Sequence, residues 1–221
     1  FFIKNALNAY SGEVLRNYLL SVHYRAVLHF SEEDLLASKK RLDKIYRLKK
    51  RVNSVSNIES KEVKSSVKNA QDLRDFATKI TSKTILNSMG DKHNDFAKNI
   101  LEAMSDDLNI SKALSVLEEM LNNANASLDK NPKDKNLKEQ ILANIDFVEY
   151  LLGIGGGDEV EYFQQGVDEA QKAQIESKIA KRAQAKKDKD FALADALRDE
   201  LAGEGIIVLD TPQGSVWEKI E

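Results

Sequence analysis

Phe191, Asp195 and Arg198 are spaced at i, i+4 and i+7 in a stretch, about residues 190–203, that favours a helix. Successive helical residues turn by about 100°, so these three side chains share one polar side. A phenylalanine there gains little from folding unless something covers it. Either a following hairpin covers Phe191, or its ring is a platform on which an unpaired nucleobase stacks, worth about 1–3 kcal/mol per base. The predicted core face of this helix carries Leu193, Ala196, Leu197 and Leu201.

Asp210 and Trp217 flank a turn in the segment that follows this helix. IIVLD is rich in β-branched and apolar residues, VWEKI alternates apolar and polar residues, and TPQGS between them has turn chemistry. The segment therefore predicts a β-hairpin. Asp210 either caps the turn or accepts hydrogen bonds from the amino or imino groups of a base. Trp217, the only tryptophan, either closes the hairpin core or stacks on a base.

The densest basic stretch, SKIAKRAQAKKDKD, leads directly into the helix that carries Phe191. Alone, such a run is typical of a solvated helix face. Joined to an aromatic tip, it is also typical of an RNA-reading module in which cations hold phosphates while the tip reads bases. The candidate phosphate-binding residues are Lys178, Lys181, Arg182 and Lys187, and Lys186 is a candidate at the tip.

Other polar clusters favour structural interpretations. Asp106, Asp107 and Asn109 precede a predicted helix and are interpreted as its caps rather than as an acid/base pair. The glycines in GIGGGD lack the preceding strand and the Gly-Lys-Ser/Thr of a phosphate loop, so they predict a helix stop and a hinge. The three histidines are scattered and match no ligand spacing, so no metal site is assigned.

The elements that position these residues are mainly helical. One helix is predicted from Gly12 to His29, and Ser31 is predicted to cap the next, whose basic second half, KKRLDKIYRLKKR, is a solvated face or a phosphate contact. After a polar stretch, a helix through Leu73, Phe76 and Ile80 is expected to break at Met89–Gly90. The expected fold class is a mainly α helical bundle followed by a small α+β tip with a β-hairpin. The expected divisions are a bundle over 1–153, a glycine-rich hinge over 154–167, and a helix–helix–hairpin over 168–221.

Composition fits a helix-rich globular protein. The 221 residues are 31% charged and 42% hydrophobic with a formal net charge of −3, so any nucleic-acid contact must use local basic patches. There is no cysteine, which excludes disulfides and thiolate metal sites within the chain. No apolar run approaches the roughly 20 residues of a membrane span, and no signal peptide pattern is present, so no membrane association is expected and the cytoplasm is the expected location.

Three stretches resemble the cysteinyl-tRNA synthetases, which are class I aminoacyl-tRNA synthetases. FALADALRDEL with GIIVLDTPQGSVWE resembles the carboxyl-terminal signature of that family. GEVLRNYLLSVHYRAVLHFSEEDL resembles the helix pair after its catalytic domain, and AMSDDLNISKALSVL resembles a further family segment. Residues 53–87 match least, and the glycine cluster departs from the family pattern.

The resemblance implies the anticodon-binding half of an enzyme that ligates cysteine to tRNA-Cys. By motif position it implies that Asp195 and Asp210 read bases of the GCA anticodon. Phe191 stands where the family often has tryptophan, and Lys186 at a position that is basic in the family. The ATP-handling HIGH and KMSKS signatures and the zinc ligands would lie upstream in a catalytic domain. This chain, which starts with Phe1 rather than methionine, is therefore expected to be a piece of a longer protein, not catalytic alone and with no cofactor of its own.

Two alternatives remain open from the sequence. A non-catalytic helical interaction module would bring the basic face to an acidic protein and would show little salt-dependent RNA binding. A cysteine ligase acting on an amino sugar would resemble the catalytic half of the family, and the anticodon-type end of this chain argues against it.

Overall fold

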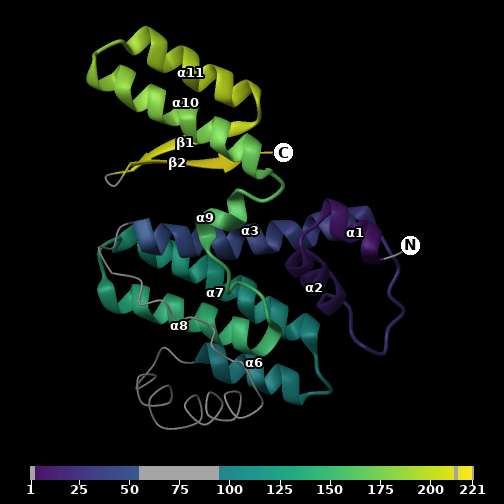
Figure 1. The fold of residues 1–221 in the computed structure, drawn as a ribbon. Coiled ribbons are helices and arrows are strands. Elements are labelled where there is room, and N and C mark those ends of the chain that lie inside the picture. Colours follow the sequence, from purple (N-terminus) through teal and green to yellow (C-terminus); the bar gives the residue numbers. More distant parts are fainter. Residues whose placement is uncertain (1–2, 55–94, 212–213, 221) are drawn as a thin grey trace, which may run out of the picture. The chain divides into compact units, whose positions relative to one another are not determined.

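The structure is a computed structural model that describes residues 3–54, 95–211 and 214–220. These residues divide into two compact units, residues 1–155 and 156–221, which are described separately (Figure 1). The division falls within residues 154–167, where a hinge is expected from the glycines. The expected helix through Leu73, Phe76 and Ile80 and its break at Met89–Gly90 lie outside the described residues.

Helices are the only regular secondary structure among the described residues of unit 1. Its helices are α1 (Ile3–Ala9), α2 (Gly12–Leu20), α3 (Glu32–Ser54), α6 (Asp95–Ser105), α7 (Ile110–Lys130) and α8 (Lys135–Leu152). Apolar residues recur along α3 at helical spacing and are fully buried, as are those of α7 and α8 that face it. The bundle core includes Leu35, Leu42, Ile45, Leu48, Ile100, Leu117, Leu121 and Ile145.

The ends of several helices follow their local sequence. The Ser31 hydroxyl accepts a hydrogen bond from the Asp34 N–H at 3.3 Å, which confirms the predicted cap of α3. Asn109 caps α7 by accepting from the Lys112 N–H at 3.1 Å. Gly153 ends α8 in the left-handed region, with φ at 70°, and its N–H reaches the Glu149 carbonyl at 2.7 Å. The predicted glycine stop is therefore confirmed.

The first long helix is shorter than predicted. It ends at Leu20 rather than His29, and the Ser21 hydroxyl donates to the Tyr18 carbonyl at 2.6 Å at that end. The following residues instead form an irregular segment, whose far end is held where the Tyr18 hydroxyl donates to the His29 carbonyl at 2.8 Å. The local bond of Ser21 and the longer-range bond between Tyr18 and His29 take the place of the helix continuation that the apolar spacing predicted.

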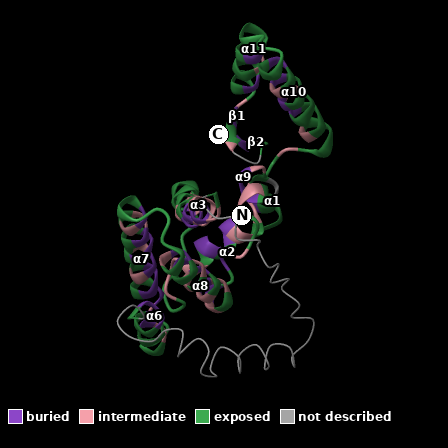
Figure 2. Ribbon diagram, turned by 90° about the vertical axis from the view of Figure 1, so that its left-hand side faces the viewer, coloured by how far each residue is buried: buried purple, intermediate pink, exposed green. Residues whose placement is uncertain are grey.

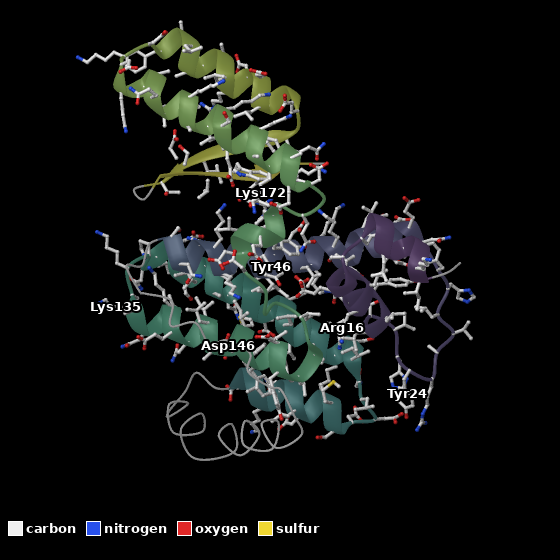
Figure 3. All side chains as sticks on the ribbon, in the orientation of Figure 1. Arg16, Tyr24, Tyr46, Lys135, Asp146 and Lys172 are labelled. Carbon is white, nitrogen blue, oxygen red and sulfur yellow. The ribbon has the colours of Figure 1, made fainter. Side chains whose placement is uncertain are left out.

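Asp107 does not cap α7. Its carboxylate accepts from the Tyr24 hydroxyl at 2.7 Å and pairs with the Arg25 guanidinium at 3.1 Å. Capping by Asn109 alone leaves Asp107 free for this contact with the segment after α2. The acid/base interpretation of the aspartate pair gains no support from this arrangement, because Asp107 is held by the Arg25 guanidinium and by the phenol of Tyr24, which is labelled in Figure 3.

Unit 2 packs two long helices against a hairpin. It contains α9 (Glu159–Phe163), α10 (Glu169–Lys187), α11 (Phe191–Gly203), β1 (Ile206–Thr211) and β2 (Gly214–Lys219). The strands are antiparallel with Val208 opposite Trp217, which confirms the predicted hairpin. The core of this unit consists of Ile175, Ile179, Leu201, Ile206, Val208 and Trp217, and exposed residues line the outer sides of α10 and α11 (Figure 2).

Candidate nucleic-acid interface

The strongest polar contact in unit 2 joins Arg182 of α10 to Asp210 of β1. Arg182 Nη1 donates to Asp210 Oδ1 at 2.8 Å, and Nη2 donates to Oδ2 at 3.0 Å. This is the bidentate geometry in which a guanidinium binds a carboxylate most specifically. Arg182 is only 4% exposed, whereas about half of the Asp210 side chain is open to solvent.

Two further donors complete the surroundings of Asp210. Lys186 Nζ donates to Oδ2 at 2.6 Å, and the Ser215 hydroxyl donates to Oδ1 at 2.7 Å. Hydrogen bonds from Arg182, then from Lys186 and Ser215, hold the pKa of the Asp210 carboxyl well below its ordinary value. Asp210 is therefore a carboxylate that only accepts hydrogen bonds, and its oxygens already receive four of them.

This cluster follows from two periodicities. Ile206, Val208 and Asp210 alternate along β1 and therefore share the face that packs on the helices. On α10, Ile179, Arg182 and Lys186 fall on one helical stripe at i, i+3 and i+7. On both elements the earlier residues of the shared face are apolar and pack in the core, and the later ones are polar and form the cluster around Asp210. Both periodicities can be read from the sequence. The prediction nevertheless treated Arg182 as one of a run of phosphate-binding cations.

Phe191 is the first residue of α11 and is 62% exposed. The hairpin therefore does not cover its ring, and that interpretation is wrong. Asp195, one turn further on, is also exposed and has no hydrogen bond or ion pair within the described part of the chain. Its charge helps to raise the pKa of Arg182, after the larger effect of the hydrogen bond to Asp210. Asp195 is therefore electrostatically coupled to the cluster around Asp210.

The buried face of α11 differs from the predicted one. Ala194 and Leu201 are buried and Leu197 is half-buried, whereas Leu193 is 47% exposed and Ala196 is exposed. The buried face of α11 is thus turned by roughly 60° towards Ala194 relative to the prediction, and Leu197 and Leu201 belong to both faces. Leu193 and Ala194 are adjacent and both apolar, so the pattern alone did not determine which of them faces α10.

Trp217 is buried, at 3% exposed, opposite Val208 in the hairpin and in the core cluster that also contains Ile179. Its ring is thus a packing element that closes the hairpin, and in this structure it presents no face on which a base could stack. Arg182 is likewise sealed against Asp210 and is not open to a phosphate. Both corrections have the same cause: each residue lies on the inner face of its element.

The remaining basic candidates of α10 fall into two kinds. Lys178 Nζ is engaged by Glu200 at 2.8 Å and by Glu204, and hydrogen bonds to these carboxylates raise its pKa. Lys181 and Lys187 are exposed and make no ion pair within residues described by the structure. Of the four candidates for phosphate contact, these two are therefore the available ones.

The basic half of α3 is largely paired within unit 1. Lys44 donates to Glu118 at 2.7 Å, and Arg51 contacts both Asp129 and Asn125. Such pairing favours the solvated-face interpretation over a phosphate contact. None of the helices described here combines the length and the apolar character required to cross a membrane.

Comparison with known proteins gives two family matches. Residues 99–154 match the DALR domain, and residues 170–217 match the cysteinyl-tRNA ligase anticodon binding domain. The second match contains every contact of Asp210 described above as well as Phe191 and Asp195.

Among the curated relatives are three cysteine–tRNA ligases. That of Helicobacter hepaticus (strain ATCC 51449 / 3B1) is 54% identical over 220 residues, which is 100% of this chain and 43% of the relative. That of Helicobacter pylori (strain Shi470) is 53% identical over 219 residues, 99% of this chain and 40% of the relative. That of Helicobacter acinonychis (strain Sheeba) is 53% identical over 220 residues, which is 100% of this chain and 40% of the relative. The chain thus spans about two fifths of the length of these relatives, at their carboxyl-terminal end.

Proposed function

Because the chain belongs to the cysteine–tRNA ligase family and contains its anticodon-binding domains, we propose that it binds tRNA-Cys and recognises the GCA anticodon through unit 2. The observation that carries this proposal is the exposed ring of Phe191 on the same small unit as the Asp210 carboxylate, which hydrogen bonds hold in its ionised form and whose side chain is about half exposed. An exposed aromatic ring offers stacking, and a carboxylate offers an acceptor for base amino groups.

In this proposal the residues of α11, the hairpin and the end of α10 have different roles in recognising the anticodon. Phe191 stacks on one anticodon base, while Asp195 and Asp210 accept hydrogen bonds from base edges. Lys186, whose side chain is 41% exposed, lies at the border between Asp210 and solvent and adds positive charge where the RNA backbone would pass. Trp217 supports the hairpin from inside and takes no direct part.

Lys181 and Lys187 supply contacts to phosphates. They lie on the solvent side of α10 and carry uncompensated charge within the described residues, so each can neutralise one phosphate. Such contacts add affinity that does not depend on sequence and weakens as salt rises. Replacing both by glutamine should weaken binding to all RNA hairpins alike and lower the slope of log affinity against log salt by about one per lysine.

The ligase reaction itself would belong to the longer protein. In this proposal, ATP and zinc act in an upstream catalytic domain of the same protein, which joins cysteine to tRNA-Cys in the cytoplasm. The present chain contains no cysteine, and among its described residues no group of three or more histidine, aspartate or glutamate side chains could hold a metal ion. These residues therefore do not fit a zinc site, and no step of the reaction is assigned to them.

Binding of labelled anticodon stem–loops tests the proposal. The chain should bind a stem–loop with the GCA anticodon more tightly than stem–loops in which one anticodon base is changed. Asp195→Ala and Asp210→Asn should each reduce this discrimination by about 1–3 kcal/mol, and should reduce affinity for the altered stem–loops less. Equal affinity of the unmodified chain for all stem–loops would refute the proposal. Binding that also lacks salt dependence would favour a helical protein-interaction module.

A further inference from the structure

Arg182 is a buried cation whose described hydrogen bonds all go to one carboxylate. Both terminal nitrogens bond to Asp210, and Nε is buried without a hydrogen-bond partner in the described residues. Removing a cation from water is costly unless a carboxylate compensates it. A buried arginine held in this way cannot reach a phosphate. Arg182 therefore needs a role other than the phosphate contact that the sequence predicted.

We propose that Arg182 is a positioning residue for base recognition. It holds Asp210 ionised and in a fixed orientation, and the ammonium group of Lys186 is the partner that leaves Oδ2 when a base N–H arrives. This inference rests on the proposed function, in which Asp210 contacts an anticodon base. It assigns to Arg182 a part that acts only through Asp210.

Arg182 is the partner that stays. Its guanidinium is planar, makes two parallel hydrogen bonds and lies almost wholly inside unit 2. Rotation of the carboxylate would break both bonds at once, which restricts the directions in which the Asp210 oxygens can accept. Ser215, opposite Asp210 in the hairpin register, holds Oδ1 from the other side.

Lys186 is the partner that can leave. It makes a single hydrogen bond to Oδ2 through a flexible side chain that is 41% exposed. Its charged group can therefore exchange this carboxylate for solvent or for a phosphate at small cost. In the absence of RNA the four acceptor positions of Asp210 are filled, so a base donor needs one of them to be vacated. Of the two cations that donate to Asp210, Lys186 is the exposed one, so its position is the one that a base can take.

Arg182→Lys tests positioning with the charge preserved. A lysine cannot reproduce the two parallel bonds, so Asp210 would keep a nearby cation but lose its fixed orientation. We expect discrimination between the GCA stem–loop and the altered stem–loops to fall about tenfold, with affinity for the altered ones within about twofold of the unmodified chain. Arg182→Gln, which removes the charge as well, should lower discrimination at least as far.

Two controls separate positioning from charge and from folding. The side chain of Lys172, on the first turn of α10 (Figure 3), makes no hydrogen bond or ion pair to any described residue, so Lys172→Gln lowers the charge of unit 2 without affecting Asp210. It should leave discrimination unchanged. Fluorescence of Trp217, the sole tryptophan and a core residue of unit 2, reports whether each variant is folded under the binding conditions.

A double-mutant cycle gives the decisive readout. If Arg182 acts through Asp210, Arg182→Lys should cause no further loss of discrimination in an Asp210→Asn background. A folded Arg182→Lys variant with full discrimination, or losses that add in the double variant, would overturn the inference and leave the proposed function standing. An unmodified chain that does not distinguish the stem–loops would overturn both.

Discussion

The Glu13 carboxylate of α2 accepts a hydrogen bond from the backbone N–H of Gly155, 142 residues further along the chain. The same carboxylate accepts from the hydroxyl of buried Tyr46, at 3.0 and 2.9 Å from its two oxygens. One side chain near the start of unit 1 therefore holds both the middle of α3 and the last residue of the unit.

Glu13→Ala should lower the free energy of unfolding of unit 1 by about 2–3 kcal/mol. The substitution removes the Glu13 carboxylate as an acceptor for the buried Tyr46 hydroxyl and for the Gly155 N–H, and hydrogen bonds to charged groups are the stronger kind. Urea unfolding followed by far-ultraviolet circular dichroism measures the change. Glu139→Ala, at an exposed glutamate of α8, is the matched control and should be nearly neutral. A similar loss in both variants would contradict this account of Glu13.

The rotation of α11 can be tested with two leucines of the same helix. Leu201 is fully buried and Leu193 is 47% exposed. Leu201→Ala should therefore destabilise unit 2 by about 2–5 kcal/mol, while Leu193→Ala should cost far less. Urea unfolding monitored by Trp217 fluorescence is the measurement, because Leu201 and Trp217 lie in the same core cluster. An equal loss of unfolding free energy in both variants would support the buried face that was predicted from the sequence.

Phe191→Ala should weaken RNA binding without affecting folding. The ring is largely exposed, so its removal costs little stability, whereas the loss of a stacking platform costs about 1–3 kcal/mol of binding energy. Fluorescence anisotropy with the GCA stem–loop measures the affinity.

Leu193→Ala is the control for Phe191→Ala. It removes an exposed apolar side chain two residues away, on a different side of α11. Its affinity for the stem–loop should match that of the unmodified chain. If Phe191→Ala binds as tightly as this control, stacking on Phe191 does not occur.

The charge of Asp210 should give unit 2 an acid-dependent component of stability. Its pKa is lowered in the folded state, whereas an unfolded aspartate titrates near 3.9. The stabilisation is therefore complete above about pH 5 and is lost progressively as pH falls through the unfolded pKa, because the unfolded chain takes up the proton first. Asp210→Asn should be less stable than the unmodified chain at pH 7, and the difference should shrink below about pH 4.

Unfolding monitored by Trp217 fluorescence across this pH range measures that difference. Asp199→Asn changes the same charge at an exposed aspartate of α11 that makes no ion pair with any described residue. It should show neither the loss at neutral pH nor the convergence in acid. Parallel behaviour of the two variants would show that the contacts of Asp210 do not contribute to stability.

The features that the sequence predicted correctly are those that depend on neighbouring residues. The Ser31 cap, the Gly153 stop and the hairpin each rest on side-chain or backbone preferences within a few positions, and the structure has all three. The end of α2 depends instead on a hydrogen bond between Tyr18 and His29, which no local pattern reveals.

In the candidate site, too, the contacts between residues far apart in the sequence could not be predicted. The position of Phe191 on the polar side of α11 left open whether the hairpin covers its ring, and only the structure shows that it does not. The pairing of Arg182 with Asp210 required knowing which stripe of α10 meets which face of β1, because the lysines around Arg182 look alike in the sequence. Asp195, Asp210, Lys186 and the exposed lysines remain predictions as RNA contacts, since their roles depend on a ligand.

The stripe on α10 that holds Ile175, Ile179, Arg182 and Lys186 has a consequence for how this family can vary. Inserting one residue before Arg182 would turn everything after it by about 100°, which would carry the guanidinium away from β1 while Ile175 and Ile179 stayed in place. An insertion between Ile179 and Arg182 would therefore break the contact with Asp210, even where single substitutions in the helix are harmless. Relatives should therefore differ between Ile179 and Arg182 by exchange of side chains rather than by inserted residues.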